Sequence, residues 1–203
     1  MSTGEVVLGV ALLVLLGVLG VLILRGRGGG QIRTSVQAGA LKFSFELSQQ
    51  ARQNVVAQLG AAVAKTGRRQ GEDAARERLA SAVEIKAGRV LWVDDHPDNN
   101  VEESLMLTGL GLAITQTTST EAALRYLGQA SYEMLITDLG REGNPAAGLD
   151  LLERLPANSG EMSSLVYTMN AGERADRAIE LGATAVVETA GELLEEVLAR
   201  FAH

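Results

Sequence analysis

The carboxyl-terminal half of this chain is predicted to form an α/β domain, with a five-stranded parallel sheet covered by helices on both faces. Strand-like and helix-like segments alternate five times between residues 89 and 203, and such alternation with short links is typical of parallel sheets. The strand segments are continuous apolar runs, as expected of strands that are buried on both faces. Two of the runs end at acidic residues, in RVLWVDD and YEMLITD. Carboxylates are therefore expected at the carboxyl edge of the sheet, where open α/β folds hold their sites.

An uncharged apolar segment at residues 6–24 precedes this domain. As a helix it would span about 28 Å, close to the bilayer core of about 30 Å. Only Glu5 stands before the segment as a charged side chain, whereas arginines follow from Arg25 onward. Because positive charge stays on the cytoplasmic side, we expect a single-pass anchor at residues 1–30 in the inner (cytoplasmic) membrane, with the rest of the chain in the cytosol. A cleaved signal or a buried core helix is the alternative.

Residues 31–87 are expected to form a small module of a hairpin and two helices. Apolar and polar residues alternate on both sides of Gly39, which is typical of a hairpin. One helix is expected from the capping Ser48 to Gly67, and a second over residues 72–86. Because a lone hairpin is marginally stable in water, the module must pack on itself, on the acidic domain or on a second copy of the chain in a homodimer.

The last part of the chain, residues 88–203, is long enough for one domain with its own core. Ser119 or Thr120 is expected to cap the second of its helices. The strands are expected at residues 90–93, 112–117, 134–137, 164–168 and 184–187, and the helices at residues 100–110, 121–130, 149–155, 173–181 and 192–201.

The charge of the chain is divided unevenly between these parts. The net charge is −7, made of +5 over residues 1–87 and −12 over residues 88–203, and there is no cysteine. The absence of cysteine excludes disulfides and thiolate metal sites. We expect the acidic half to repel nucleic acid.

The motifs of the acidic half resemble those of the receiver domain of bacterial two-component response regulators. The likeness rests on VLWVDD, LITD, a glycine at Gly148, VYT and LGATAVVETAGEL, in that order. It implies a flavodoxin-like doubly wound fold, a signalling role without enzymatic activity, and a sensor histidine kinase or phosphotransfer protein as the partner in a phosphorelay.

The resemblance also implies site residues and a magnesium cofactor. Asp138 would be the phosphoacceptor, Asp94 and Asp95 would hold Mg²⁺ with it, the backbone carbonyl of Gly140 would complete the metal shell, and Thr168 would hydrogen-bond the phosphoryl group. The chemistry agrees, because Mg²⁺ prefers oxygen ligands and retains several waters. Without the ion, converging carboxylates repel one another, so at least one should have a raised pKa. Strand-end aspartates that only bind loop amides are the structural alternative.

The chain departs from the family pattern where receivers carry a lysine followed by proline. The matching positions hold Thr189 and Ala190, and no lysine follows Lys86. Because charge-assisted hydrogen bonds are about twice as strong as neutral ones, Thr189 would be a weak substitute. Arg141 or Arg174 is a candidate replacement. The loop LGREGNPAAG is also about two residues longer than is usual in the family and lacks its Met-Pro pair.

We expect a membrane-tethered receiver that accepts a phosphoryl group on aspartate and signals through protein contacts. A receiver-like scaffold that acts without phosphorylation is the first alternative. The second is a haloacid-dehalogenase-type phosphatase, which is disfavoured because it requires Asp-x-Asp and a downstream lysine. His96, directly after the acid pair, is expected in an exposed loop.

Overall fold

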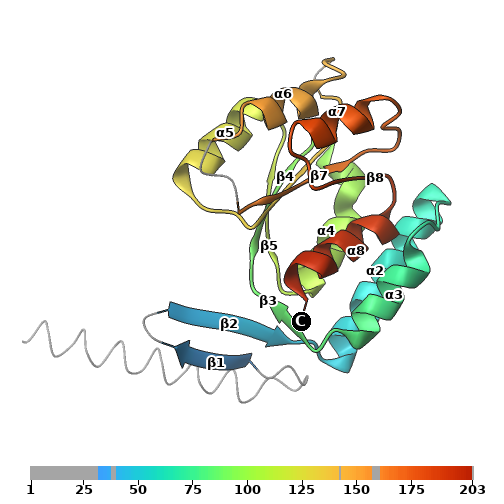
Figure 1. The fold of residues 1–203 in the computed structure, drawn as a ribbon. Coiled ribbons are helices and arrows are strands. Elements are labelled where there is room, and N and C mark those ends of the chain that lie inside the picture. The colour runs from blue at the N-terminus through green and yellow to red at the C-terminus, as the bar shows by residue number, and fades with distance from the viewer. Residues whose placement is uncertain (1–31, 38–39, 142, 157–160, 203) are drawn as a thin grey trace, which may run out of the picture.

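The computed structural model describes residues 32–37, 40–141, 143–156 and 161–202 (Figure 1). The expected membrane anchor at residues 6–24 lies outside this part of the chain. Of the helices in the described ranges, none combines the length and apolar character needed to cross a bilayer.

The acidic half contains one five-stranded sheet in the order β5-β4-β6-β7-β8, and every neighbouring pair is parallel. The prediction of a five-stranded parallel sheet is therefore confirmed. The strands are β4 (Arg89–Val93), β5 (Ala113–Thr117), β6 (Met134–Thr137), β7 (Ser163–Tyr167) and β8 (Ala185–Val187).

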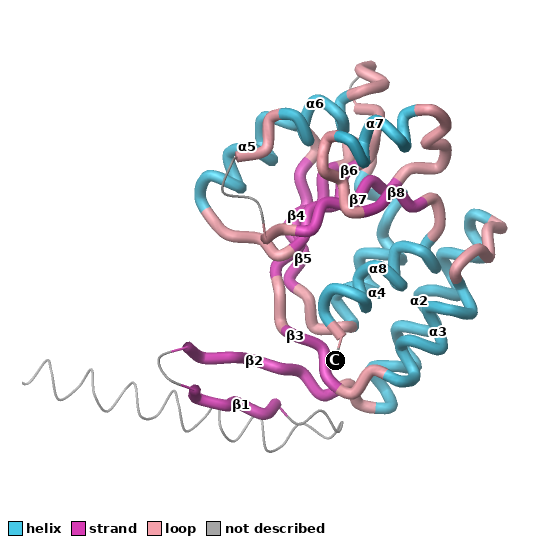
Figure 2. Tube along the Cα trace, viewed as in Figure 1, coloured by secondary structure: helices cyan, strands magenta, loops and turns pink. Residues whose placement is uncertain are grey.

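Helices cover both faces of this sheet (Figure 2). Successive side chains of β4 point to opposite faces, so Val90 and Trp92 join one core cluster and Leu91 and Val93 another. The first cluster lies under α4 and α8, and the second lies under α5 and α6. The helices are α4 (Val101–Gly109), which follows the 3₁₀ turn η1 (Pro97–Asn100), then α5 (Thr120–Gln129), α6 (Ala147–Glu153), α7 (Arg174–Glu180) and α8 (Ala190–Phe201).

The preceding module contains the predicted hairpin and the first of the two predicted helices. Ser48 caps α2 by accepting a hydrogen bond from the Ala51 amide, and Gly67 ends the helix with a φ of 69°. This left-handed conformation is one that glycine adopts at little cost. The elements are β1 (Ile32–Gln37), β2 (Ala40–Glu46), α2 (Gln49–Thr66), α3 (Glu72–Ser81) and β3 (Glu84–Lys86).

The prediction of one helix over residues 72–86 is wrong for residues 82–86. The helix ends at Ser81, and Glu84–Lys86 forms β3, which pairs antiparallel with β2. Ile85 in this strand is buried. The strand depends on a partner about forty residues earlier in the chain, so local helix propensity did not decide its conformation.

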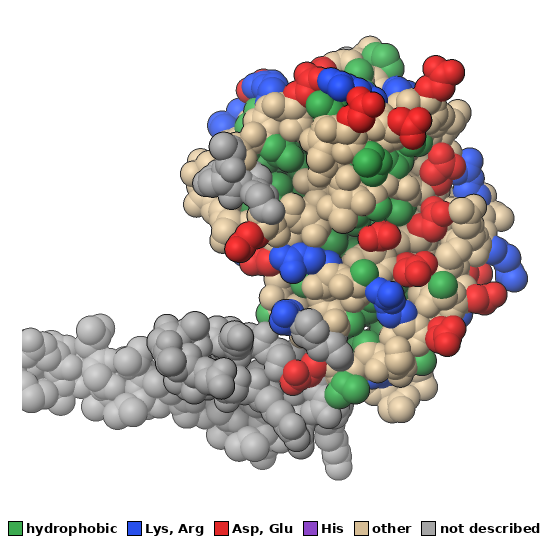
Figure 3. All heavy atoms as spheres, in the orientation of Figure 1, with side chains coloured by type: hydrophobic (Ala, Val, Ile, Leu, Met, Phe, Trp, Pro, Cys, Tyr) green, Lys and Arg blue, Asp and Glu red, His purple; other side chains and the backbone are tan. Residues whose placement is uncertain are grey.

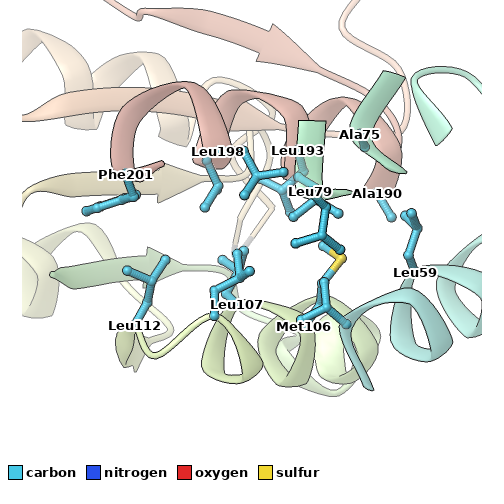
Figure 4. Close-up of a cluster of buried hydrophobic side chains, with 14 of the residues drawn as sticks. Leu59, Ala75, Leu79, Met106, Leu107, Leu112, Ala190, Leu193, Leu198 and Phe201 are labelled. Atoms are coloured by element: carbon cyan, nitrogen blue, oxygen red, sulfur yellow. The ribbon is translucent and has the colours of Figure 1, made fainter. Parts of the chain in front are cut away.

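The helices α2 and α3 pack against α4 and α8. Of the three expected possibilities, the module therefore packs on the acidic domain. Figure 4 shows Leu59 of α2 and Leu79 of α3 in one cluster with two side chains of the acidic domain. These two are Met106 of α4 and Leu193 of α8. The side chains that the module contributes to this core are Leu47, Val55, Leu59, Ala62, Val63, Ala75, Leu79, Ala82 and Ile85. The module and the parallel sheet therefore share one hydrophobic core.

Candidate functional site

One cavity of about 590 Å³ lies at the carboxyl edge of the sheet. Asp94 follows β4, Asp138 follows β6 and Thr168 follows β7, and all three line this cavity. Its other lining residues are Lys65, Thr66, His96, Asn99, Asn100, Glu103, Tyr167, Met169 and Asn170. A cavity of about 630 Å³ lies near the amino edge of the sheet, around Tyr132 and Arg200. The first cavity is the candidate site because the strand-end acids meet there.

The carboxylate of Asp94 is held by two protein donors. The His96 backbone amide donates to Oδ1 over 2.7 Å, and the Asn100 side chain donates to Oδ2, also over 2.7 Å. Asn100 is buried, so it positions Asp94 from inside the fold. The sequence predicted this asparagine only as part of a helix start. Its side-chain amide, six residues after Asp94, was the signal from which this contact could have been predicted.

Asp95 and His96 lie beside Asp94. One ligand atom from each of the three residues lies within 4.8 Å of the others, and His96 Nδ1 is 3.0 Å from an Asp95 oxygen. His96 is exposed, as its loop position predicted. The two carboxylates are hard oxygen donors, so the residues present fit Mg²⁺.

Asp138 and Gly140 are the other two expected metal ligands. Asp138 shares the cavity with Asp94, but it is not a member of the described group of ligand atoms within 4.8 Å. Gly140 is not among the described residues that line the cavity. The Leu139 amide donates to Asp138 Oδ1 over 2.6 Å.

Burial raises the pKa of the Asp138 carboxyl, and the nearby charge of Asp94 adds to the increase. The Leu139 amide, a hydrogen bond from the Thr168 side chain and the charge of Arg141 act in the opposite direction. The predicted rise of one carboxyl pKa is confirmed for Asp138. Its leading cause is burial, with repulsion between carboxylates second among the raising effects.

Thr189 occupies the position of the family's lysine and is engaged in other contacts. Its hydroxyl donates to the Gln70 backbone carbonyl over 2.7 Å and accepts from the Glu192 amide over 3.2 Å. The second bond is part of a capping box that starts α8. Thr189 is buried and is not among the described residues that line the cavity.

Arg141 is buried beside the turn that carries Asp138. Its guanidinium donates to the Asp138 carbonyl over 2.7 Å and to the Thr137 hydroxyl over 2.6 Å. It also donates to Thr120 over 3.0 Å and to the Ala147 carbonyl over 2.9 Å. These bonds make Arg141 a support of the loop that follows Asp138.

Arg174 also binds backbone groups outside the cavity. It donates to the Pro145 carbonyl over 2.5 Å and to the Asn170 carbonyl over 3.4 Å. It therefore ties the long loop after Asp138 to the start of α7 and is not among the described residues that line the site.

Lys65 reaches the cavity from α2, outside the part of the chain that carries the motifs. Its ammonium donates to the Asn99 carbonyl over 2.7 Å and lies 3.3 Å from a carboxylate oxygen of Glu102. No spacing rule links this lysine to acids that begin twenty-nine residues later, so it was not predicted from the sequence.

Glu103 is a buried acidic residue that lines the same cavity. It accepts a hydrogen bond from the Tyr167 hydroxyl over 2.9 Å, while its other oxygen is buried with no hydrogen-bond partner among the described residues. Burial raises the pKa of Glu103, and burial together with this carboxylate raises the pKa of Tyr167.

We expect Glu103 to make the protein less stable as the pH rises. Above the ordinary glutamate pKa of about 4.3 the unfolded chain has lost a proton that folded Glu103 still holds, so the free energy of unfolding falls until the raised pKa is passed. Urea unfolding of Glu103→Gln between pH 4 and pH 8 should show a flatter pH dependence than the wild type. The exposed Glu77→Gln serves as the control, and an equal slope in all three proteins would contradict the assignment.

One family of known proteins matches the part of the chain that carries this geometry. The family described as the response regulator receiver domain matches residues 90–194. Among solved structures, the response regulator TrrA of Thermotoga maritima in complex with Mg²⁺-BeF is 24% identical, with a TM-score of 0.48, over 54% of this chain and 95% of that one. The chemotaxis response regulator CheY4 of Vibrio cholerae is 21% identical, with a TM-score of 0.49, over 56% of this chain and 98% of that one. A search of curated proteins gives no match. Since the family match spans just over half of the 203 residues, this chain belongs to the response regulator receiver domain family.

Proposed function

We propose that this protein is a membrane-tethered response-regulator receiver that accepts a phosphoryl group on Asp138 and signals through protein contacts. The observation that carries the proposal is the meeting of Asp94, Asp138 and Thr168 in one cavity at the carboxyl ends of three neighbouring strands. Phosphorylation on an aspartate is general to the family to which the chain belongs.

In the proposed reaction, a carboxylate oxygen of Asp138 attacks the phosphorus of a phosphohistidine on a sensor kinase or phosphotransfer protein. The new oxygen–phosphorus bond forms as the phosphorus–nitrogen bond breaks, and the imidazole nitrogen keeps the electron pair. The Thr168 hydroxyl, which donates to Asp138, is placed to donate to the transferred group. Attack of water on the phosphorus later releases phosphate and restores the carboxylate.

Asp94 and Asp95 are the residues that would hold magnesium, together with Asp138 from the same cavity. The bound ion would neutralise charge on the transferring phosphoryl group. Asn100 and the His96 amide would keep the Asp94 carboxylate in place for this role.

The membrane part of the proposal rests on sequence. Residues 6–24 are uncharged and long enough to span a bilayer, and arginines follow them. The anchor would hold the receiver at the cytosolic face of the inner membrane. Sedimentation with membranes, and protection of the receiver from protease added outside intact cells, are the measurements that test this topology.

The charge of the acidic half supports the proposal that the binding partners are proteins. Residues 88–203 carry −12, and Figure 3 shows acidic and basic side chains interspersed on the face that it displays. Such a surface lacks the single-signed basic field that favours nucleic acid on that face. The family's partners are sensor kinases and phosphotransfer proteins, and we propose the same class here.

We expect the purified full chain to incorporate labelled phosphate from acetyl phosphate or a phosphorylated kinase, in the presence of Mg²⁺. Asp138→Asn should abolish the label, because an amide cannot form the acyl phosphate. Asp150→Asn is the control, since this exposed aspartate lies in the same part of the chain. Labelling of Asp138→Asn at the wild-type level would reject Asp138 as the acceptor.

A phosphorylation-independent scaffold is the second candidate function. One observation favours it, because Thr189 at the lysine position is occupied by contacts with Gln70 and Glu192. Under this alternative the wild-type chain would remain unlabelled with every donor.

A further inference from the structure

Lys65 brings an ammonium group to the acid cavity from outside the family-matched segment. It lies in the last turn of α2, which precedes the matched residues 90–194. Its side chain lines the cavity together with Asp94 and Asp138, and it is 42% exposed. An ammonium that is partly open to solvent can change partners without a large cost of burial.

The charges in the cavity favour such a cation. Asp94, Asp138 and Glu103 all line it, and Lys65 is the one lysine or arginine among its described lining residues. Phosphorylation of Asp138 would replace the single negative charge of the carboxylate with a phosphoryl group of about −1.5 to −2 that has three strong acceptor oxygens. An ammonium has three donors, and two of the Lys65 contacts are with Asn99 and Glu102.

The nearby arginines are held elsewhere. Arg68 donates to the Met169 carbonyl over 2.7 Å and lies 3.5 Å from a Glu188 carboxylate oxygen. Arg141 and Arg174 bind the loop after Asp138. Of these four cations, Lys65 is the one among the described residues that line the cavity.

Close backbone packing holds the turn between α2 and α3 against the start of α8. The Thr189 hydroxyl binds the Gln70 carbonyl, and a methyl group placed on Gly191 would lie only 2.5 Å from the Glu72 amide nitrogen. The absence of a side chain at Gly191 therefore permits the two backbones to meet. Thr189, at the family's lysine position, thus contacts the turn between α2 and α3, which begins two residues after Lys65.

We propose that Lys65 binds the phosphoryl group on Asp138 as its counter-cation. This inference rests on the proposed function. On phosphorylation the ammonium exchanges its contact with the Glu102 carboxylate for a phosphoryl oxygen, while α2 stays docked on α4 and α8. Helix α2 then responds to the state of the site, which makes the membrane-proximal module part of the receiver's switch.

The test uses the full chain and beryllium fluoride as the phosphoryl mimic, at saturating Mg²⁺, with binding followed by the fluorescence of Trp92, the single tryptophan. We expect Lys65→Gln to weaken beryllofluoride binding about tenfold, the scale of one charge-assisted hydrogen bond. Lys65→Arg should recover most of the affinity. Glu102→Gln removes the same ion pair but keeps the cation, so its binding should be at least as tight as that of the wild type.

A separate titration with Mg²⁺ alone distinguishes charge from structural damage. Lys65→Gln should bind Mg²⁺ at least as tightly as the wild type, because it removes a cation from the acid cavity. A merely misfolded cavity would weaken both ligands. Arg69→Gln is the matched control, since this side chain is 82% exposed and lies four residues further along.

Each outcome bears on one proposal or on both. Equal beryllofluoride affinity in Lys65→Gln and the wild type would overturn the role of Lys65 alone. That role would also be overturned if Arg68→Gln, rather than Lys65→Gln, lost the affinity. A wild-type chain that binds no beryllofluoride and accepts no phosphate would overturn the proposed function, and the role of Lys65 with it.

Discussion

Leu59→Ala should lower the free energy of unfolding of the whole chain by about 2–5 kcal/mol, because it leaves a cavity in a shared core. Leu59 is fully buried in α2 and belongs to the cluster that includes Met106 of α4 and Leu193 of α8. Urea unfolding should show one transition that moves to lower denaturant, since the module and the sheet are stabilised by the same contacts.

The control for this experiment lies on the same helix. Gln53 is exposed, so Gln53→Ala should change the stability by no more than about 0.5 kcal/mol. Two separate transitions, with Leu59→Ala moving only the weaker one, would show that residues 31–87 and the receiver fold independently.

Gly148→Ala should destabilise the protein by about 1–3 kcal/mol and displace the turn that carries Asp138, because there is no room for a side chain. A methyl group at this position would overlap the carbonyl oxygen of Asp138 and lie 3.0 Å from the Leu139 Cα atom. These are backbone atoms, so relief requires the turn that carries Asp138 to shift. Beryllofluoride affinity should fall together with stability.

Gly128→Ala is the matched control for that substitution. Gly128 lies in α5, and among the described residues no heavy atom beyond its chain neighbours and the nearby backbone of its own helix lies within 4 Å of an added methyl group. Because alanine is the better helix former, this variant should be as stable as the wild type or slightly more stable. If Gly148→Ala behaved like Gly128→Ala, the close contact at Asp138 would not constrain the site.

Much of the site was predictable because its signals are local. The apolar runs that end at Asp94 and Asp138 placed both acids at the carboxyl edge of a sheet whose five strands the structure contains. The caps at Ser48 and Gly67 were equally readable, since a cap depends on a few neighbouring residues.

The contacts that complete the cavity were not predictable in the same way. Asn100 holds Asp94 through a bend of the chain, and Lys65 arrives from another helix. Thr189 matches the position of the family's lysine. Its hydroxyl, however, donates to the carbonyl of Gln70, which lies more than one hundred residues earlier in the chain. No periodicity within a short window carries information about such partners.

Over residues 88–203, the sequence by itself determined the order of strands and helices and placed acids at the edge of the sheet. It could do so because periodicity, capping and strand ends are short-range properties. Only the tertiary structure decided that Glu84–Lys86 is a strand, that α2 and α3 cover α4 and α8, and that Lys65 enters the acid cavity. Strand pairing and helix docking are set by burial between segments far apart in the chain, and local propensity is too weak to specify them.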